Sequence, residues 1–251
     1  MKPTQDKVAL AFMAHPDDAE FLCAGTLVRL REAGWQVHVA TATPGDCGSA
    51  TQDRWEISAV RTKEARRACE LIEATYHCLD ERDAFVVFDK PALKKAIDLM
   101  RRVCPALVFT HAPKDYMMDH EMVSLVARAA TFAYGIPNAS DVPRPAGAVV
   151  PHLYYCDPFE GSSDPYSVKP QPTTLVDVTG AYDRKAAMLA CHASQREWLR
   201  AHHGIDEYMD AMRRHAEERG KRTGARYAEA FVQHRGHAYP EDDLLATLFP
   251  E

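Results

Sequence analysis

Runs of apolar residues that do not alternate with polar ones constrain the fold of this chain most. The first of them, Val8–Ala14, contains no polar residue. A strand with one face in water alternates polar and apolar positions, so this run indicates a strand that is buried on both faces. Similar runs alternate with helical patterns along most of the chain. This alternation predicts a Rossmann-like α/β fold, a mostly parallel sheet with helices on both faces.

Several predicted elements carry local signals at their ends. Gly34 is placed to end the first helix. Asp53, with Glu56 three residues later, has the pattern of a capping box at the start of another. The predicted strands cover residues 8–14, 35–42, 76–79, 85–88, 106–110, 149–156 and 173–178, and the predicted helices cover residues 24–33, 53–74, 91–103, 119–134, 183–202 and 206–219.

We predict one domain over residues 1–251. The strand–helix alternation breaks over residues 136–172, where proline and glycine are frequent. We interpret this stretch as a long surface excursion and not as a domain boundary. The highly charged segment at about residues 196–240 predicts a C-terminal helical extension with a solvated face.

Composition excludes several functional classes. The formal net charge is −6, which argues against general nucleic-acid binding, because that needs clustered Lys and Arg. The seven cysteines are odd in number and form no C-x-x-C motif, so we predict reduced thiols. No apolar run is long enough to span a membrane, and the N-terminus lacks the core of a signal peptide. The predicted location is the cytoplasm.

The segment His15-Pro16-Asp17-Asp18 follows directly after the first predicted strand. Ligands of open α/β sheets bind at the carboxyl ends of the strands, so a His and two carboxylates are well placed there. His15 and Asp18 are three residues apart, and in a turn both side chains can face one metal ion. Asp17 lies between them and can act beside the metal. The alternative interpretation is a His-Pro turn whose Asp residues cap a helix.

Asp119-His120 opens a predicted helix after the strand at residues 106–110. Taken alone, the pair could be an N-cap residue and an exposed histidine. With His15 and Asp18, however, His120 completes a set of two histidines and one carboxylate. Three protein ligands and a water hold catalytic zinc, and the same set can hold ferrous iron.

The sequence around these residues resembles the PIG-L/LmbE-like family of zinc-dependent N-acetylglucosamine deacetylases. Ala14–Glu20 followed by Gly25-Thr26-Leu27 is similar to the opening motif of the family, and the resemblance spans roughly residues 7–200. Further similar segments are Thr43–Asp46, Arg61–Ala65, Asp119-His120, Val176–Thr179 and Lys185–Gln195.

The resemblance implies a role for each matching residue. His15, Asp18 and His120 would bind Zn2+, and Asp17 would be the general base. Arg61 would contact substrate or organise the pocket, and a solvated helix charge is the alternative. Asp46 would bind substrate by orienting a ligand or a group that supports one, and a plain turn residue is the alternative.

One position departs from the family. Many members read His-Pro-Asp-His where this chain has Met117-Met118-Asp119-His120. The first His of that motif would polarise the substrate carbonyl, so Met117 removes that group. The replacements considered are Tyr116, His111, His192 and His237. His192 could equally be a buried structural histidine, and His237 would act in the site of a neighbouring subunit.

The predicted function is removal of an acetyl group from an N-acetylglucosamine-type or related small molecule by metal-activated water. An amidase acting on a non-sugar N-acyl compound and a non-catalytic metal- or sugar-binding protein remain as alternatives. A nucleotide-dependent oxidoreductase is disfavoured, because no G-x-G-x-x-G follows the first strand. The resemblance also implies a trimer or hexamer.

Overall fold

The first apolar run forms strand β1 (Val8–Met13), all of whose residues are buried. It lies in the middle of a seven-stranded sheet with the order β3-β2-β1-β4-β5-β7-β6. β1 is parallel to β2 (Gln36–Thr41) on one side and to β4 (Leu107–Thr110) on the other. The remaining strands are β3 (Thr75–Cys78), β5 (His152–Cys156), β6 (Thr174–Asp177) and β7 (Ala228–His234).

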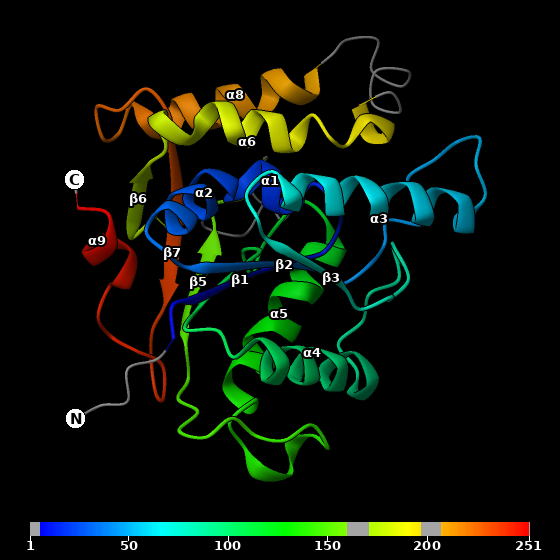
Figure 1. The fold of residues 1–251 in the computed structure, drawn as a ribbon, viewed down its shortest axis with the longest axis vertical. Helices are drawn as coiled ribbons and strands as arrows, with labels where there is room; N and C mark the ends of the chain where they lie inside the picture. The colour runs from blue at the N-terminus through cyan, green and yellow to red at the C-terminus, as the bar shows by residue number, and fades with distance from the viewer. Residues whose placement is uncertain (1–5, 160–170, 197–206, 251) are drawn as a thin grey trace.

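This computed structural model describes residues 6–159, 171–196 and 207–250. Helices cover both faces of the sheet, with α1, α2, α3, α6 and α8 on one face and α4 and α5 on the other (Figure 1). Their bounds are α1 Asp18–Leu22, α2 Ala24–Glu32, α3 Arg54–Glu70, α4 Lys90–Val103, α5 Met118–Ala133, α6 Tyr182–Leu189, α8 Glu207–Gly220 and α9 Leu244–Leu248, with 3₁₀ turns at Pro137–Ala139 and Thr179–Ala181.

Two hydrophobic cores lie under these helix layers. Alternate residues of β1 point to opposite cores, Ala11 and Met13 to one and Leu10 and Phe12 to the other. The chain leaves β1 for β2 in one direction and reaches β4 in the other, so the strand order reverses at the carboxyl end of β1. In open α/β sheets this reversal forms the crevice that binds ligands.

The predicted sheet, its parallel strands and its two helix layers are confirmed. The capping box is also present, since Asp53 accepts the backbone N–H of Glu56 and the Glu56 side chain accepts that of Asp53. All seven cysteines lie in the described part of the chain and are unpaired. None of the helices that the structure describes is long and apolar enough to cross a membrane.

The predicted strand at residues 85–88 is wrong. This segment is irregular, and Phe85, Val87 and Phe88 are exposed. The backbone N–H groups of Ala84 and Val86 donate to the carboxylate of Asp119 at 2.7 and 3.3 Å, and these bonds replace the ladder of a neighbouring strand.

Two predictions near the C-terminus also need correction. The proposed helical extension contains β7, which is antiparallel to both β5 and β6. Glu229 and Gln233 are buried polar residues of this strand. Because a buried strand is expected to be apolar, the sequence pattern did not indicate a strand here. The helix predicted for residues 183–202 ends as α6 at Leu189 and resumes at residues 193–196 after a turn; residues 197–202 lie outside the described residues.

Glu229 explains why a polar residue occupies a core strand. Its carboxylate accepts the backbone N–H groups of Gly25 and Thr26 at 2.9 and 2.7 Å and the Thr26 hydroxyl at 2.6 Å. These N–H groups belong to the first turn of α2, where no intrahelical acceptor exists. Lys185 pairs with the same carboxylate, and both side chains are almost fully buried. The pair therefore fixes α2 and α6 against β7.

Breaking this pair should destabilise the fold. We expect Lys185→Met to lower the free energy of unfolding by about 3 kcal/mol, because it leaves a buried carboxylate without its cation. The midpoint of thermal unfolding should fall by roughly 6–12 °C. Arg184→Met is the matched control, since Arg184 pairs with Glu32 on the surface and such pairs contribute about 1 kcal/mol or less. Equal unfolding temperatures for the two variants would refute this role of Lys185.

Candidate active site

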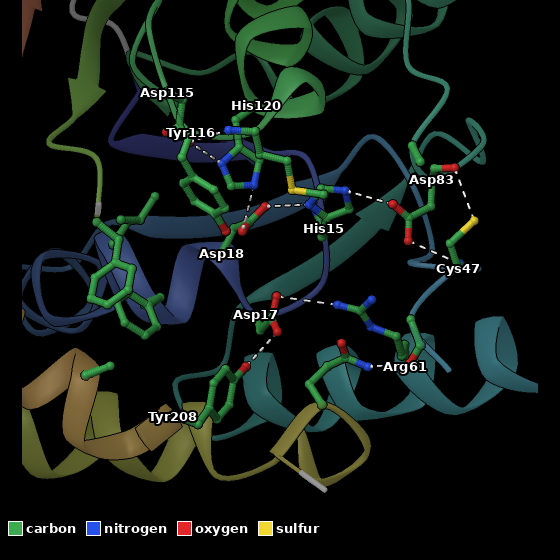
Figure 2. Close-up of a pocket in the computed structure, with 18 of the residues that line it drawn as sticks. His15, Asp17, Asp18, Cys47, Arg61, Asp83, Asp115, Tyr116, His120 and Tyr208 are labelled. Atoms are coloured by element: carbon green, nitrogen blue, oxygen red, sulfur yellow. Dashed lines mark hydrogen bonds and ion pairs between the residues drawn. The ribbon is translucent and has the colours of Figure 1, made fainter. Parts of the chain in front are cut away.

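A cavity of about 730 Å³ opens at the carboxyl end of β1. His15, Asp17 and Asp18 reach it from the turn after β1, and His120 reaches it from the first turn of α5 (Figure 2). Asp83, Asp115 and Arg61 also line it. The cavity thus lies at the reversal of strand order, where the topology predicts a ligand site.

The His-Pro-Asp-Asp turn is held in a strained conformation. Asp17 has φ 99° and ψ −24°, in a region that non-glycine residues rarely adopt. The Asp18 carboxylate accepts the backbone N–H of His15 at 2.7 Å and thereby closes the turn. Backbone strain of this kind costs of order 1–3 kcal/mol and is concentrated at functional sites. Here it points the Asp17 carboxylate away from that of Asp18 (Figure 2).

The residues predicted as metal ligands lie together. Asp18 Oδ2 is 3.5 Å from His15 Nδ1, and Asp18 Oδ1 is 3.4 Å from His120 Nε2. One ligand atom from each of the three side chains falls within a cluster of 4.8 Å. Two imidazoles and one carboxylate are a donor set that suits zinc or iron.

The second nitrogen of each imidazole is held by a carboxylate. His15 Nε2 lies 3.1 Å from Asp83 and 3.2 Å from Asp119. His120 Nδ1 lies 2.9 Å from Asp115. Metal-binding histidines in proteins commonly donate their other N–H to a carboxylate, which fixes the tautomer and the ring direction. The residues present therefore fit a metal ion, with His15 Nδ1 and His120 Nε2 turned toward Asp18.

The electrostatics of the cluster also favour a cation. Burial disfavours the charged form of His15, but Asp119, Asp18 and Asp83 outweigh it and raise the pKa of His15 well above its usual value. Burial would raise the pKa of Asp18, but His120 and His111 outweigh it and hold that pKa well below the usual range. Carboxylates gathered in a buried site are stable only beside positive charge.

Asp17 is set apart from the ligand cluster and is held by two donors. Tyr208, on α8, donates its hydroxyl to Asp17 Oδ2 at 2.6 Å, and the Arg61 guanidinium lies 3.5 Å from Oδ1 (Figure 2). Burial raises the pKa of Asp17, and Arg61 opposes that shift. A carboxylate with a raised pKa beside a metal site has the properties of a general base.

Arg61 is 4% exposed and joins two loops of the site. It donates to the backbone carbonyls of Pro16 and Gly45 at 2.8 and 3.3 Å. Gly45 has φ 73°, and a Cβ there would come within 2.3 Å of the guanidinium. This close approach explains the glycine in the Thr43–Asp46 motif. Arg61 is thus buried beside Asp17, unlike the solvated charge considered as its alternative.

Asp46 is not among the residues that line this cavity. It accepts the backbone N–H of Asp83 at 2.8 Å and pairs with Arg82 at 2.6 Å. It therefore holds the loop that carries Asp83 against His15. Its described contacts are with the Asp83 backbone and with arginine side chains, and none of these is a contact with the cavity.

The four candidates for polarising the substrate carbonyl occupy different places. Tyr116 lines the cavity beside Met117, with its ring edge-on to His120 at 5.3 Å. His111 stacks beneath His120 at 3.9 Å, fully buried. His192 is fully buried 3.3 Å from Glu20. His237 is exposed after β7, near the amino end of β5 and thus away from the carboxyl edge that carries the cavity. Only Tyr116 of the four lines the described cavity.

Several residues of the site could not be recognised from the sequence. Asp119 does not cap α5. Its carboxylate lies within hydrogen-bond distance of the His15 ring and accepts the backbone N–H of Ala84. Asp115 and Asp83 lie in loops without a periodic pattern. Tyr208 lies on α8 and is 191 positions from Asp17 in the sequence. Aspartates in loops after strands were a weak signal for the first two, and no local signal pointed to Tyr208.

The profile of the PIG-L family, described as GlcNAc-PI de-N-acetylase, matches residues 10–131. The 4-oxalmesaconate hydratase of Pseudomonas putida is 28% identical over 200 residues, which cover 76% of this chain and 75% of the relative. The diacetylchitobiose deacetylase of Thermococcus kodakarensis is 24% identical over 232 residues, which cover 89% of this chain and 81% of the relative.

The fold is similar to a solved structure of the N,N'-diacetylchitobiose deacetylase from Pyrococcus horikoshii. The TM-score is 0.76 at 23% identity, covering 95% of this chain and 88% of the other. The similarity to the PIG-L/LmbE-like family that the motifs predicted is confirmed by these matches.

Removing the carboxylate behind His120 should weaken metal binding. We expect Asp115→Ala to lower zinc affinity by about 10–100-fold, because His120 loses the acceptor that orients its ring. A competition titration against a chelator measures the affinity. Asp89→Ala is the control, since Asp89 caps α4 at Ala92 and has no contact with the cluster. An unchanged affinity in Asp115→Ala would show that His120 needs no orienting partner.

Proposed function

We propose that this protein is a zinc-dependent hydrolase that removes the acetyl group from an N-acetylglucosamine-type substrate. The observation that carries the proposal is the position of Asp17, a carboxylate with a raised pKa held by Tyr208 and Arg61 at the edge of the three-ligand cluster. In a metal-binding protein without catalysis, Asp17 would have no function. The match to the PIG-L family and the similarity to deacetylases support the reaction class.

His15, Asp18 and His120 would hold the zinc ion. When bound, zinc supplies Lewis acidity, which lowers the pKa of a bound water toward about 7 and polarises a carbonyl oxygen. Asp17 takes a proton from the water as it attacks the acetamide carbon. The C–N bond then breaks, acetate forms, and Asp17 returns the proton to the leaving amine nitrogen.

Tyr208 and Arg61 have complementary effects on this base. Both stabilise the carboxylate form of Asp17, and burial stabilises the protonated form. A base that must accept a proton and later donate it works best when its pKa lies near the working pH. The two donors also fix the direction of the carboxylate, so that little reorganisation is needed during the reaction.

Asp17→Asn should abolish turnover and preserve the metal site. The amide cannot accept a proton, but it keeps the size of the side chain and can still bond Tyr208. We expect kcat to fall at least about 100-fold. Zinc content should stay at the wild-type level, because Asp17 is outside the ligand set. Acetate release with a zinc assay on the same sample measures both. More than a few per cent of the wild-type rate would exclude Asp17 as the base.

We propose Tyr116 as the group that replaces the polarising histidine. It is the one candidate of the four that lines the described cavity, and a phenol O–H can stabilise the oxyanion that forms on the acetyl carbonyl. Tyr116→Phe should lower kcat on the order of 100-fold without loss of zinc. Tyr239→Phe is the control, since its hydroxyl bonds the Arg128 carbonyl away from the cavity. Equal kcat values for the two variants would reject Tyr116.

A second candidate function is hydration of an unsaturated carboxylic acid. Two observations favour it: the similarity to the 4-oxalmesaconate hydratase and the methionine at position 117. Both reactions need a base that takes a proton from water, so the metal cluster and Asp17 are compatible with either. Incubation with 4-oxalmesaconate, followed by the loss of its ultraviolet absorbance, tests hydration. Acetate release from N-acetylglucosamine derivatives tests the deacetylase.

A further inference from the structure

A second cavity, of about 660 Å³, is lined by one side of α3 from Arg54 to Arg66 and by residues 44, 46 and 80–82. We call this cavity the α3 pocket. None of its lining residues lines the active-site cavity. A molecule that binds in the α3 pocket is therefore distinct from the substrate of the candidate active site.

Positive charge gathers in the α3 pocket, although the chain as a whole has a formal net charge of −6. The cations in its lining are Arg54, Lys63, Arg66 and Arg82. Lys63 and Arg66 are exposed, and in the described part of the chain no carboxylate forms an ion pair with either of them. Both side chains are therefore available to an anion from solution.

Arg54 and Arg82 share one carboxylate. Oδ2 of Asp46 lies 2.6 Å from Nε of Arg82 and 4.0 Å from Nε of Arg54. The Asp46 side chain is buried, whereas both arginine side chains are exposed. A single carboxylate neutralises one guanidinium, so one positive charge remains beside it. A guanidinium has five N–H donors, and most of those of the two arginines are left for a ligand.

The other acidic residues of the lining do not cancel this excess. Glu81 pairs with Lys95, which is outside the pocket, at 2.7 Å. Asp80 is the remaining carboxylate of the lining. The four cations of the pocket thus share two carboxylates, those of Asp46 and Asp80. The excess of two positive charges matches a phosphate dianion better than a single carboxylate group.

Trp55 adds a flat aromatic surface to the same pocket. Its side chain is 69% exposed, more than any other large hydrophobic side chain in the described part of the chain. The guanidinium carbon of Arg54 lies 4.1 Å from the centroid of its ring. An exposed tryptophan beside arginines is suited to stack on a nucleobase, and such stacking contributes about 1–3 kcal/mol.

We propose that the α3 pocket binds a nucleoside phosphate, with its base stacked on Trp55 and its phosphates held by the arginines and Lys63. A guanidinium donates two parallel hydrogen bonds to a phosphate, which favours Arg54, Arg66 and Arg82 as the binding groups. A volume of about 660 Å³ is in the range of small-molecule sites. The proposal does not depend on the deacetylase function.

Calorimetry with ADP and its two fragments tests the class of ligand. Adenosine has the base without the charge, and pyrophosphate has the charge without the base. The wild-type protein should bind ADP at least about tenfold more tightly than either fragment, because only ADP engages both the tryptophan and the cations. Absence of ADP binding, or an affinity for either fragment equal to that for ADP, would overturn the inference.

Variants on α3 locate the site. Trp55→Ala and Arg66→Gln should each lower the affinity for ADP by about tenfold, through loss of stacking and of a phosphate contact. Arg67→Gln is the matched control, since Arg67 is the next residue of the helix, is also exposed and does not line the pocket. An ADP affinity that survives in Trp55→Ala, or that falls equally in Arg67→Gln, would reject the α3 pocket as the site.

Removal of metal separates this site from the candidate active site, where phosphates could bind a zinc ion. ADP bound in the α3 pocket should keep its affinity after treatment of the protein with a chelator and lose it in Trp55→Ala. The reverse pattern would place ADP at the metal and overturn the inference. Since no acetate release is measured, failure of the proposed deacetylase activity would leave the outcome of this test unchanged.

Discussion

The carboxylate of Asp18 is the point on which the site depends. It closes the turn after β1 through the N–H of His15, and it lies within 3.5 Å of imidazole nitrogens of His15, His111 and His120. These residues come from the ends of β1 and β4 and from the start of α5. They can meet only because β1 and β4 are neighbours in the sheet. The parallel pairing of two buried apolar strands therefore determines where a metal ion can bind.

Site and fold are joined through the same carboxylates. Asp119 bonds His15 on one side and, on the other, the backbone of residues 84–86, which forms no strand as a result. Asp46 holds the neighbouring backbone of Asp83 in the same way. The loop after β3 is thus ordered by groups that serve the metal cluster. A substitution that removes one of these carboxylates changes both the imidazole it orients and the loop it supports.

The features that could be predicted from the sequence are those whose interactions join residues close together in the chain. Strand β1, the capping box of α3 and the His15–Asp18 turn are set by neighbouring residues, and their patterns predicted them. The segment at residues 85–88 has the composition of a strand, but a side chain 33 residues away takes up its N–H groups. Strand β7 contains a buried glutamate whose partners lie on α2 and α6. Tyr208 reaches Asp17 across 191 positions. No local pattern records contacts of this kind.

Activation of water is the part of this site that deacetylation and hydration share, since both need the metal cluster and a base such as Asp17. The choice of substrate must therefore come from the groups that hold the rest of the molecule. At position 117 the chain has a thioether, which cannot donate a hydrogen bond, so Tyr116 becomes the donor nearest in sequence that also lines the cavity. Tyr208, on α8, donates its hydroxyl to the Asp17 carboxylate, and Arg214 of the same helix also lines the cavity. The direction of the Asp17 carboxylate therefore depends on a helix far along the chain.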